Sequence, residues 1–338
     1  GEPMKLNRIA LTLTLIIVSS SVFAQDANPI KWGVSLGTGT TTYESIIFTD
    51  SASSGDQLLR TDEVDLSSLL FAIDARSGKH QVSFSTNTAD EESMSISGNY
   101  YDDYANPSRT SDFDDQSLTY TYSLTDQWKL SFGYNTLTID KGWANSYDRT
   151  NTFVAGNAAD TWTVTSLQSI STERSGATAL ISYVQPFGES GKWIAVGRIG
   201  FTAQEYEESG AGTIRYSGVS AASEACWNGT TCNLGGASYQ MNGDGYNDTY
   251  TTSGDNTSGV FGISLIYVLD NPRHTLNFDF TTRDNEYGVL VGSQNQTSLG
   301  GYFSGNSVRS DSFDLDNDNQ QVDETVWTFT VKWRYGLN

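Results

Sequence analysis

The segment Trp327-Thr328-Phe329-Thr330-Val331-Lys332-Trp333-Arg334-Tyr335 alternates apolar and polar side chains over its whole length. Successive side chains of a β-strand point to opposite faces, so this segment forms a strand with one apolar and one polar face. An amphipathic helix would repeat its apolar residues every three or four positions instead. We therefore predict that the chain ends in a strand that separates an apolar surface from a polar one.

The same period of two recurs along most of the chain, for example at 117–124 and 128–135. Three of the strands that it predicts, at 62–76, 172–187 and 191–206, carry apolar residues on both faces, which indicates some apolar packing on the inner side as well. In total we predict ten strands, at 30–48, 62–76, 79–97, 115–125, 127–142, 172–187, 191–206, 257–270, 273–287 and 323–336.

The connections between these strands alternate in length. Short turns at 76–79, 125–127, 188–192 and 270–273 separate long polar segments at 49–61, 98–114, 143–171, 207–256 and 288–322. A transmembrane β-barrel has this asymmetry, with short periplasmic turns and long extracellular loops, whereas a soluble sandwich has no reason to lengthen every second connection. The predicted fold is an all-β, antiparallel, up-and-down transmembrane barrel of about ten strands, with both ends in the periplasm.

The N-terminus has the features of an export signal. Lys5 and Arg8 follow Met4, a mostly apolar run covers residues 9–18, and small residues precede Ala24. This order is typical of a cleaved signal peptide, and the run is shorter than the roughly 20 residues that cross a bilayer as a helix. We expect residues 1–24 to be extra N-terminal residues plus a cleaved signal peptide, and residues 25–338 to form the barrel domain.

The last predicted strand resembles the aromatic-rich C-terminal strand that the outer-membrane assembly machinery recognises in barrel proteins of Gram-negative bacteria. The chain differs from that pattern by ending in Gly336-Leu337-Asn338 rather than in an aromatic residue. The resemblance implies a location in the outer membrane, contact with its lipid and lipopolysaccharide, and the assembly machinery as a partner. The residues that would form the assembly signal are Trp327, Phe329, Val331, Trp333 and Tyr335.

The polar faces of the strands would point into the barrel. Closure of the last strand on the first is expected to bring Lys31 near Lys332, with an acidic partner such as Asp279. About eight strands already fill with side chains, whereas roughly 16 to 18 leave an aqueous channel, so ten strands predict a plugged or very narrow lumen. The predicted lumen-lining charges are Lys31, Lys129, Arg198, Asp279, Arg283, Lys332 and Arg334.

The chain is strongly acidic, with 40 acidic and 19 basic residues and a net charge of −21. A nucleic-acid partner is not expected, because a polyanion needs a basic surface. Carboxylates spaced two apart can hold calcium, as in the middle of a calcium-binding loop, although a solvated acidic loop is the alternative. The candidate calcium residues are Asn242, Asp244, Tyr246 and Asp248 in one segment, and Asp314, Asp316 and Asp318 in the other. No other cofactor is expected.

The long segment 207–256 contains both cysteines of the chain, Cys226 and Cys232. In an oxidising compartment they are expected to form one small disulfide-closed loop. Loops of this length tend to carry function, so this one could recognise an extracellular ligand, or could simply cover the barrel mouth.

The sequence gives little evidence for a catalytic site. In size and strand number the chain resembles the omptin proteases, a resemblance that implies a histidine with acidic residues at the extracellular rim. This sequence has two histidines, His80 and His274, and both lie beside predicted periplasmic turns. An enzyme is therefore not expected.

Three functions follow, in decreasing order of support. The first is a non-enzymatic surface protein whose loops bind a partner or stabilise the envelope. The second is a narrow, porin-like channel for small solutes or ions. The third is an omptin-like or lipid-modifying enzyme with a carboxylate in place of a rim histidine.

Overall fold

A computed structural model describes residues 29–51, 55–93, 95–97, 108–151, 160–188, 191–217, 245–287, 291–299, 309–311 and 320–337. The regular elements in these ranges are all β-strands. The same ranges contain no helix that is long and apolar enough to cross a membrane.

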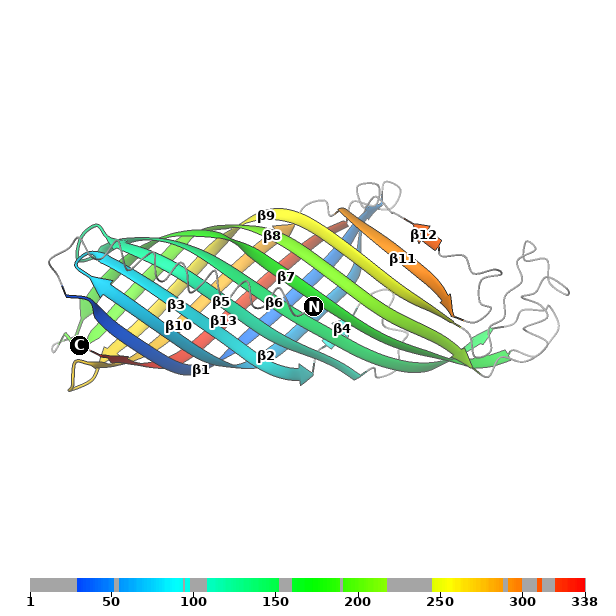
Figure 1. Cartoon of the computed structure of the whole chain (residues 1–338), viewed down its shortest axis with the longest axis horizontal. Coiled ribbons are helices and arrows are strands. Elements are labelled where there is room, and N and C mark those ends of the chain that lie inside the picture. The colour runs from blue at the N-terminus through cyan, green and yellow to red at the C-terminus, as the bar shows by residue number, and fades with distance from the viewer. Residues whose placement is uncertain are drawn as a thin grey trace.

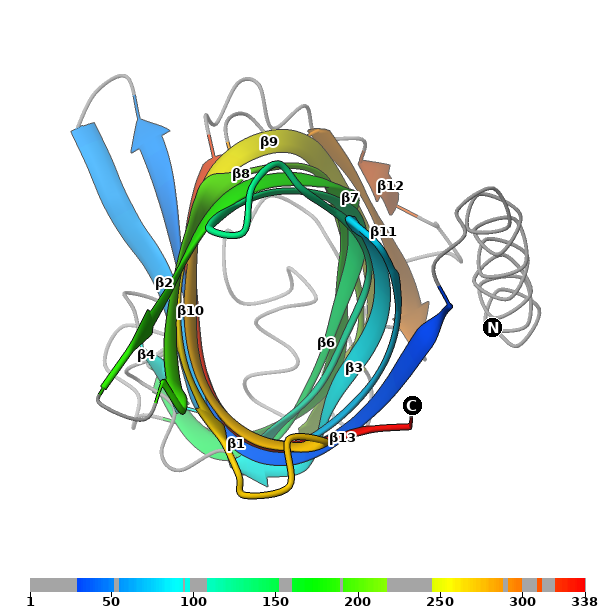
Figure 2. The same ribbon diagram turned by 90° about the vertical axis from the view of Figure 1, so that its left-hand side faces the viewer.

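Ten strands form a closed antiparallel ring, in which β13 pairs with β1 on one side and with β10 on the other. The strands run obliquely to the long axis (Figure 1), and the ring is oval when viewed from its end (Figure 2). The ring consists of β1 (Lys31–Ser51), β2 (Gly55–Ser77), β3 (His80–Ser93), β5 (Ser108–Ser123), β6 (Trp128–Asn151), β7 (Asp160–Phe187), β8 (Trp193–Ser217), β9 (Gly245–Val268), β10 (His274–Tyr287) and β13 (Gln320–Gly336).

Three short strands lie outside this ring and extend its ladders: β4 (Ser95–Ser97) pairs with β2, β11 (Val291–Leu299) pairs with β9, and β12 (Arg309–Asp311) pairs with β11. Closure leaves the ten ring strands without an edge, which is what a sheet needs in order to cross hydrocarbon with its backbone groups paired. The predicted ten-stranded up-and-down barrel is confirmed.

Large apolar side chains point outward over the half of the wall next to the short turns. Leu69 is 69% exposed and Ile199 is 61% exposed, which would be unfavourable for so many side chains in water but suits contact with lipid. We call this surface the apolar belt; its members include Trp32, Leu36, Leu69, Phe71, Trp128, Phe132, Ile181, Ile199, Phe201, Phe261, Ile263, Phe280, Trp327, Phe329 and Trp333. The belt marks the part of the barrel that lies in the membrane.

Aromatic pairs border the belt at the short-turn end. The ring centroids of Trp193 and Tyr267 are 4.6 Å apart, and those of Trp128 and Tyr183 are 4.9 Å apart. Amphipathic aromatic rings are favoured where hydrocarbon meets headgroups, and outer-membrane barrels carry girdles of them. These pairs therefore mark the periplasmic border of the membrane.

The strands are strongly staggered around the ring. A row of directly paired residues that starts at Trp32 on β1 runs through Ala75, Phe132 and Asp284 and returns to β1 at Glu44, twelve residues further along. Such a stagger tilts the strands relative to the barrel axis. It also means that residues at one height of the barrel come from different rows.

Several strands are longer than the alternation predicts, and here the prediction is wrong. β6 continues to Asn151, β7 begins at Asp160, β8 continues to Ser217 and β9 begins at Gly245, so parts of the expected loops 143–171 and 207–256 are strand. Beyond the belt the outward face meets water instead of lipid. Its residues are therefore polar or small, and the apolar–polar alternation that identifies a strand fades.

Acidic side chains dominate the outward face directly beyond the belt. We call this zone the acidic collar, and in the described strands its outward positions carry no lysine or arginine. It brings together residues from nine strands of the ring: Glu44, Glu63, Asp65, Asp112, Asp114, Asp140, Glu173, Glu205, Glu207, Asp255, Asp284 and Asp323. Much of the chain's negative charge is thus on the wall that leaves the membrane on the extracellular side.

Candidate functional site

The membrane-embedded half of the lumen contains linked ion pairs. Asp279 on β10 binds Lys332 of β13 at 2.5 Å and Arg198 of β8 at 3.2 Å. Arg334 of β13 donates two hydrogen bonds, of 2.9 and 2.7 Å, to the carboxylate of Asp74 on β2. The five side chains of these ion pairs remain partly exposed, at 11–32%. These charges therefore line a partly open space rather than a sealed core.

One prediction about the lumen, that Lys31 lies near Lys332, is wrong. Lys332 lies opposite Gly37 on β1, and Lys31 lies opposite Arg76 on β2, so Lys31 and Lys332 are not neighbours. The stagger of β13 against β1 separates them along the strand. The expected pairing of Lys332 with Asp279 is present.

Arg283 lies further from the periplasmic end. Its Nη2 binds Asp115 of β5 at 2.8 Å, across the lumen from β10. Lys31, Arg76 and Lys129, at the periplasmic mouth of the lumen, form no ion pair with the described residues. Of the predicted inward charges, Arg198, Asp279, Arg283, Lys332 and Arg334 form ion pairs, whereas Lys31 and Lys129 form none with the described residues.

At the extracellular end of the belt the lumen contains a buried apolar core. Leu66 and Ile139 have no exposed surface, and Leu137 and Tyr43 are each 1% exposed. We call this cluster the plug, and it consists of Tyr43, Val64, Leu66, Ala89, Phe113, Leu137, Ile139, Ile170 and Val326. The apolar packing that the two-sided strands predict inside the barrel is confirmed.

Two buried ion pairs reinforce the plug. Lys141 of β6 binds Asp62 of β2 at 2.9 Å, and Arg174 of β7 binds Glu324 of β13. Both cations also donate to the phenol oxygen of Tyr43, at 3.4 and 3.3 Å. Because charges without water need partners, this arrangement ties strands from opposite walls together. Ion pairs and hydrogen bonds therefore hold the plug together in addition to its apolar packing.

These plug residues were missed in the sequence. Lys141, Arg174 and Glu324 lie within the predicted strands 127–142, 172–187 and 323–336, and the inward parity of Lys129 and Lys332 would have identified Lys141 and Glu324. Arg174 lies on a strand with apolar residues on both faces, so its direction could not be predicted.

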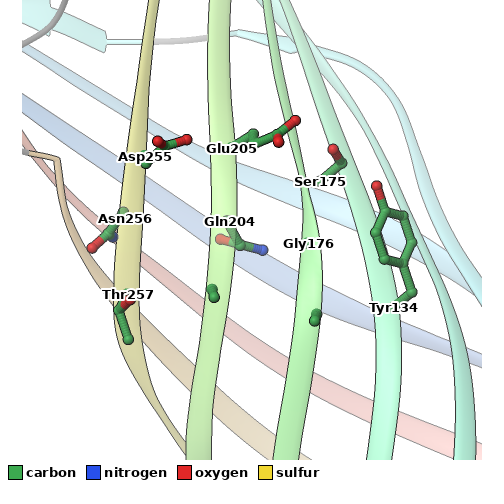
Figure 3. A pocket seen from close by; sticks show the side chains of 10 residues that line it. Tyr134, Ser175, Gly176, Gln204, Glu205, Asp255, Asn256 and Thr257 are labelled. Atoms are coloured by element: carbon green, nitrogen blue, oxygen red, sulfur yellow. The ribbon is translucent and has the colours of Figure 1, made fainter.

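The outer wall has its own groove of about 490 Å³, where the belt meets the acidic collar. Its residues come from β6, β7, β8 and β9, as Figure 3 shows for Tyr134, Ser175, Glu205 and Asp255. Small residues make the hollow: Gly176, Ala177 and Ala203 form its floor and walls. The groove offers an aromatic ring, hydroxyl groups and two exposed carboxylates at the boundary between the belt and the collar.

Both histidines lie at the periplasmic end of the outer face. Nδ1 of His80 is 2.7 Å from the hydroxyl of Tyr120, and Nε1 of Trp333 donates to Nδ1 of His274 at 3.2 Å. The ring of His274 also stacks on that of Trp333, with centroids 5.4 Å apart. Both imidazoles are engaged in the periplasmic girdle, far along the strands from the acidic collar.

Most of the predicted loop chemistry lies outside the described residues: Asn242, Asp244, Asp314, Asp316, Asp318, Cys226 and Cys232. Tyr246 and Asp248 belong to β9, whose backbone there pairs with β8 and β11. The proposed assembly residues Trp327, Phe329, Val331, Trp333 and Tyr335 face outward on β13. In the described ranges, no three or more His, Cys, Asp or Glu side chains are grouped so that they could hold a metal ion.

No family model matches this sequence, and no curated protein matches it. Among solved structures, the chain is similar to the outer membrane protease OmpT from Escherichia coli, with a TM-score of 0.52 and 9% identity over 91% of this chain and 97% of that one. The translocator domain of the autotransporter NalP from Neisseria meningitidis matches with a TM-score of 0.41 and 8% identity, over 98% and 96% of the two chains.

At 9% identity the likeness to OmpT extends to the fold alone. The apolar belt, the aromatic girdle and the closed ring agree with that fold, because such a wall is stable only where lipid surrounds it. This chain is a ten-stranded β-barrel of the Gram-negative outer-membrane type, located in the outer membrane.

Proposed function

We propose that this protein is a non-enzymatic surface barrel that stabilises the envelope and binds a ligand on its extracellular side, without conducting solutes. The observation that carries the proposal is the plug. A buried cluster from seven of the ten ring strands, with buried ion pairs that reach between walls, lies where the barrel leaves the membrane. A path for water or ions would have to disrupt that packing, which costs several kcal/mol for each buried charge left unpaired, roughly 3–5.

The positions of the histidines support a non-enzymatic role. A general base must lie within hydrogen-bonding reach of the proton that it takes, and an extracellular substrate cannot reach the periplasmic girdle. His80 and His274 both lie in that girdle and contact aromatic side chains there. Hydrolysis at the extracellular rim would need carboxylates alone.

The groove on the outer wall suits a sugar-bearing ligand. Glu205 and Asp255 can accept hydrogen bonds from hydroxyl groups, and the ring of Tyr134 provides an apolar face beside them. The groove lies at the level of the outer-leaflet headgroups, where lipopolysaccharide presents its sugars. We therefore propose the sugar part of the surrounding glycolipid as the ligand class, since phosphate groups would be repelled by the collar.

Planar-bilayer recording tests the closed lumen. The wild-type barrel is expected to give no steady openings, whereas a double variant Tyr43→Ala/Leu137→Ala, which thins the plug, is expected to conduct. A matched variant of two lipid-facing residues, Leu36→Ala/Leu69→Ala, should stay silent. Faster migration of unboiled samples on SDS gels confirms that each variant is folded.

Steady openings of the wild type would overturn the proposal and favour the narrow channel. In that case neutralising Arg283 or Lys332, which lie below the plug, should change the ion selectivity. The partly exposed ion pairs in the membrane-embedded half of the lumen are the feature that such a channel would use.

A further inference from the structure

The periplasmic mouth of the lumen is basic although the chain as a whole carries a charge of −21. Lys31 on β1, Arg76 on β2, Lys129 on β6 and Arg334 on β13 all occupy inward positions close to the short turns. The outward collar beyond the belt is acidic. In the described strands the periplasmic mouth and the collar therefore carry opposite charge.

Two of these cations face each other directly. Lys31 and Arg76 form a cross-strand pair on the same face of the β1–β2 ladder. Like charges directly opposite each other destabilise a sheet. The row of paired residues through Lys31 and Arg76 reaches β6 at Ser131, and Lys129 lies two residues closer to the periplasmic end on the same inward face. Three positive charges therefore converge at the mouth.

The nearby carboxylates already form ion pairs with other cations. Asp74 accepts both hydrogen bonds from Arg334, and Asp279 holds Lys332 and Arg198. At the rim, Lys192 binds Asp270 at 2.5 Å. In the described turns, Asp126 is the remaining acidic side chain without an ion pair, and it is exposed. One negative charge thus stands beside three positive ones. The convergence is not neutralised by the described part of the chain.

We propose that this mouth, formed by Lys31, Arg76 and Lys129, binds a phosphate group that enters from the periplasmic side. A phosphate offers several charged oxygens, so it can accept from a guanidinium and from two ammonium groups at once. The phosphate belongs either to a soluble periplasmic compound or to the headgroup of an inner-leaflet phospholipid at the rim. This site is independent of the plug and of the outer-wall groove.

Isothermal titration calorimetry of the folded barrel in a non-ionic detergent tests the site, with inorganic tripolyphosphate as the probe. The wild type is expected to bind it saturably. The variant Lys31→Gln/Arg76→Gln should bind it about a hundredfold more weakly, since each of the two lost charge-assisted hydrogen bonds is worth about a factor of ten. The control Lys79→Gln/Arg273→Gln removes the same charge from exposed turns and should bind like the wild type.

A second measurement uses the wild type alone, in case the variants fold poorly. Tripolyphosphate should slow the acetylation of Lys31 and Lys129 by a small reagent, read by mass spectrometry, while Lys79 reacts at an unchanged rate. Wild type without saturable binding, equal binding by the mouth and turn variants, or equal protection of Lys79 would each overturn the proposal.

Nanodiscs distinguish the two sources of phosphate. If the ligand is a headgroup, discs of phosphatidylglycerol should protect Lys31 and Lys129 without added tripolyphosphate, compared with discs of phosphatidylcholine. If it is soluble, protection should depend on tripolyphosphate in both kinds of disc.

Discussion

The guanidinium of Arg174 on β7 donates a hydrogen bond of 3.3 Å to the phenol oxygen of Tyr43 on β1, the opposite wall of the barrel. The same guanidinium forms an ion pair with Glu324 of β13, and all three side chains are at most 2% exposed. The plug is thus held by polar contacts across the lumen as well as by apolar packing. A buried pair of this kind costs most when only one partner is removed.

Replacing Arg174 alone should therefore destabilise the barrel strongly. We expect Arg174→Met to lower the free energy of unfolding by about 3–5 kcal/mol, because Glu324 is left buried without its cation. The measurement is urea-induced unfolding in lipid vesicles, followed by tryptophan fluorescence. The double variant Arg174→Met/Glu324→Leu should recover much of the loss. An equal loss in the single and double variants would show that the ion pair is not the cause.

The boundary between belt and collar predicts where the membrane ends. Phe132 lies near the middle of the belt and Thr138 lies beside the collar, on the same outward face of β6. Phe132→Arg should cost about 2–4 kcal/mol, as for a charge near the bilayer midplane, and Thr138→Arg about 1 kcal/mol or less. The same unfolding measurement applies to both. Similar costs at the two positions would mean that the membrane extends over the collar.

Inward glycines let neighbouring backbones approach closely in the staggered wall. A Cβ atom added at inward Gly176 of β7 would collide with the carbonyl oxygen of Ala203 on β8, whereas at Gly259, on the outward face of β9, nothing lies within 4 Å. Gly176→Ala is expected to cost about 1–3 kcal/mol through overpacking, and Gly259→Ala less than about 0.5. The temperature at which unboiled protein loses its fast migration on SDS gels reports the difference. A Gly259→Ala variant as labile as Gly176→Ala would contradict this.

The exposed pair at a periplasmic turn predicts a pH effect. The hydrogen bond and charge of Lys192 hold the pKa of Asp270 below its ordinary value of 3.8. A lowered pKa in the folded state contributes stability above the unfolded pKa, which is lost as the pH falls through the folded value. Because the pair is solvent-exposed, that contribution is small. Lys192→Gln should raise the pKa of Asp270 towards 3.8 in an NMR titration, and Lys79→Gln should leave it unchanged.

The assignment of faces within each strand could be predicted because it is local. The alternation of Trp327, Phe329 and Trp333 with Thr328, Thr330 and Lys332 puts the first set on the lipid side and the second in the lumen, whatever the neighbouring strands do. Turn lengths are local too, which is why the ten strands and their up-and-down order follow from the sequence.

Contacts between strands could not be predicted in the same way. The pairing of Lys332 with Asp279 was predicted, but Lys31 lies opposite Arg76 and away from Lys332. That outcome depends on the stagger, which shifts one strand against the next and accumulates to twelve residues around the ring.

The sequence by itself thus determined a ten-stranded barrel, its lipid-facing side and the sign of its charge, because each of these depends on residue type and on the period of two. Only the tertiary structure decided that Arg174 meets Tyr43 and Glu324, that Lys31 and Arg76 converge at the mouth, and which residues form the plug. Those contacts join residues from walls far apart in the sequence, and they exist only once the ring has closed with its particular stagger.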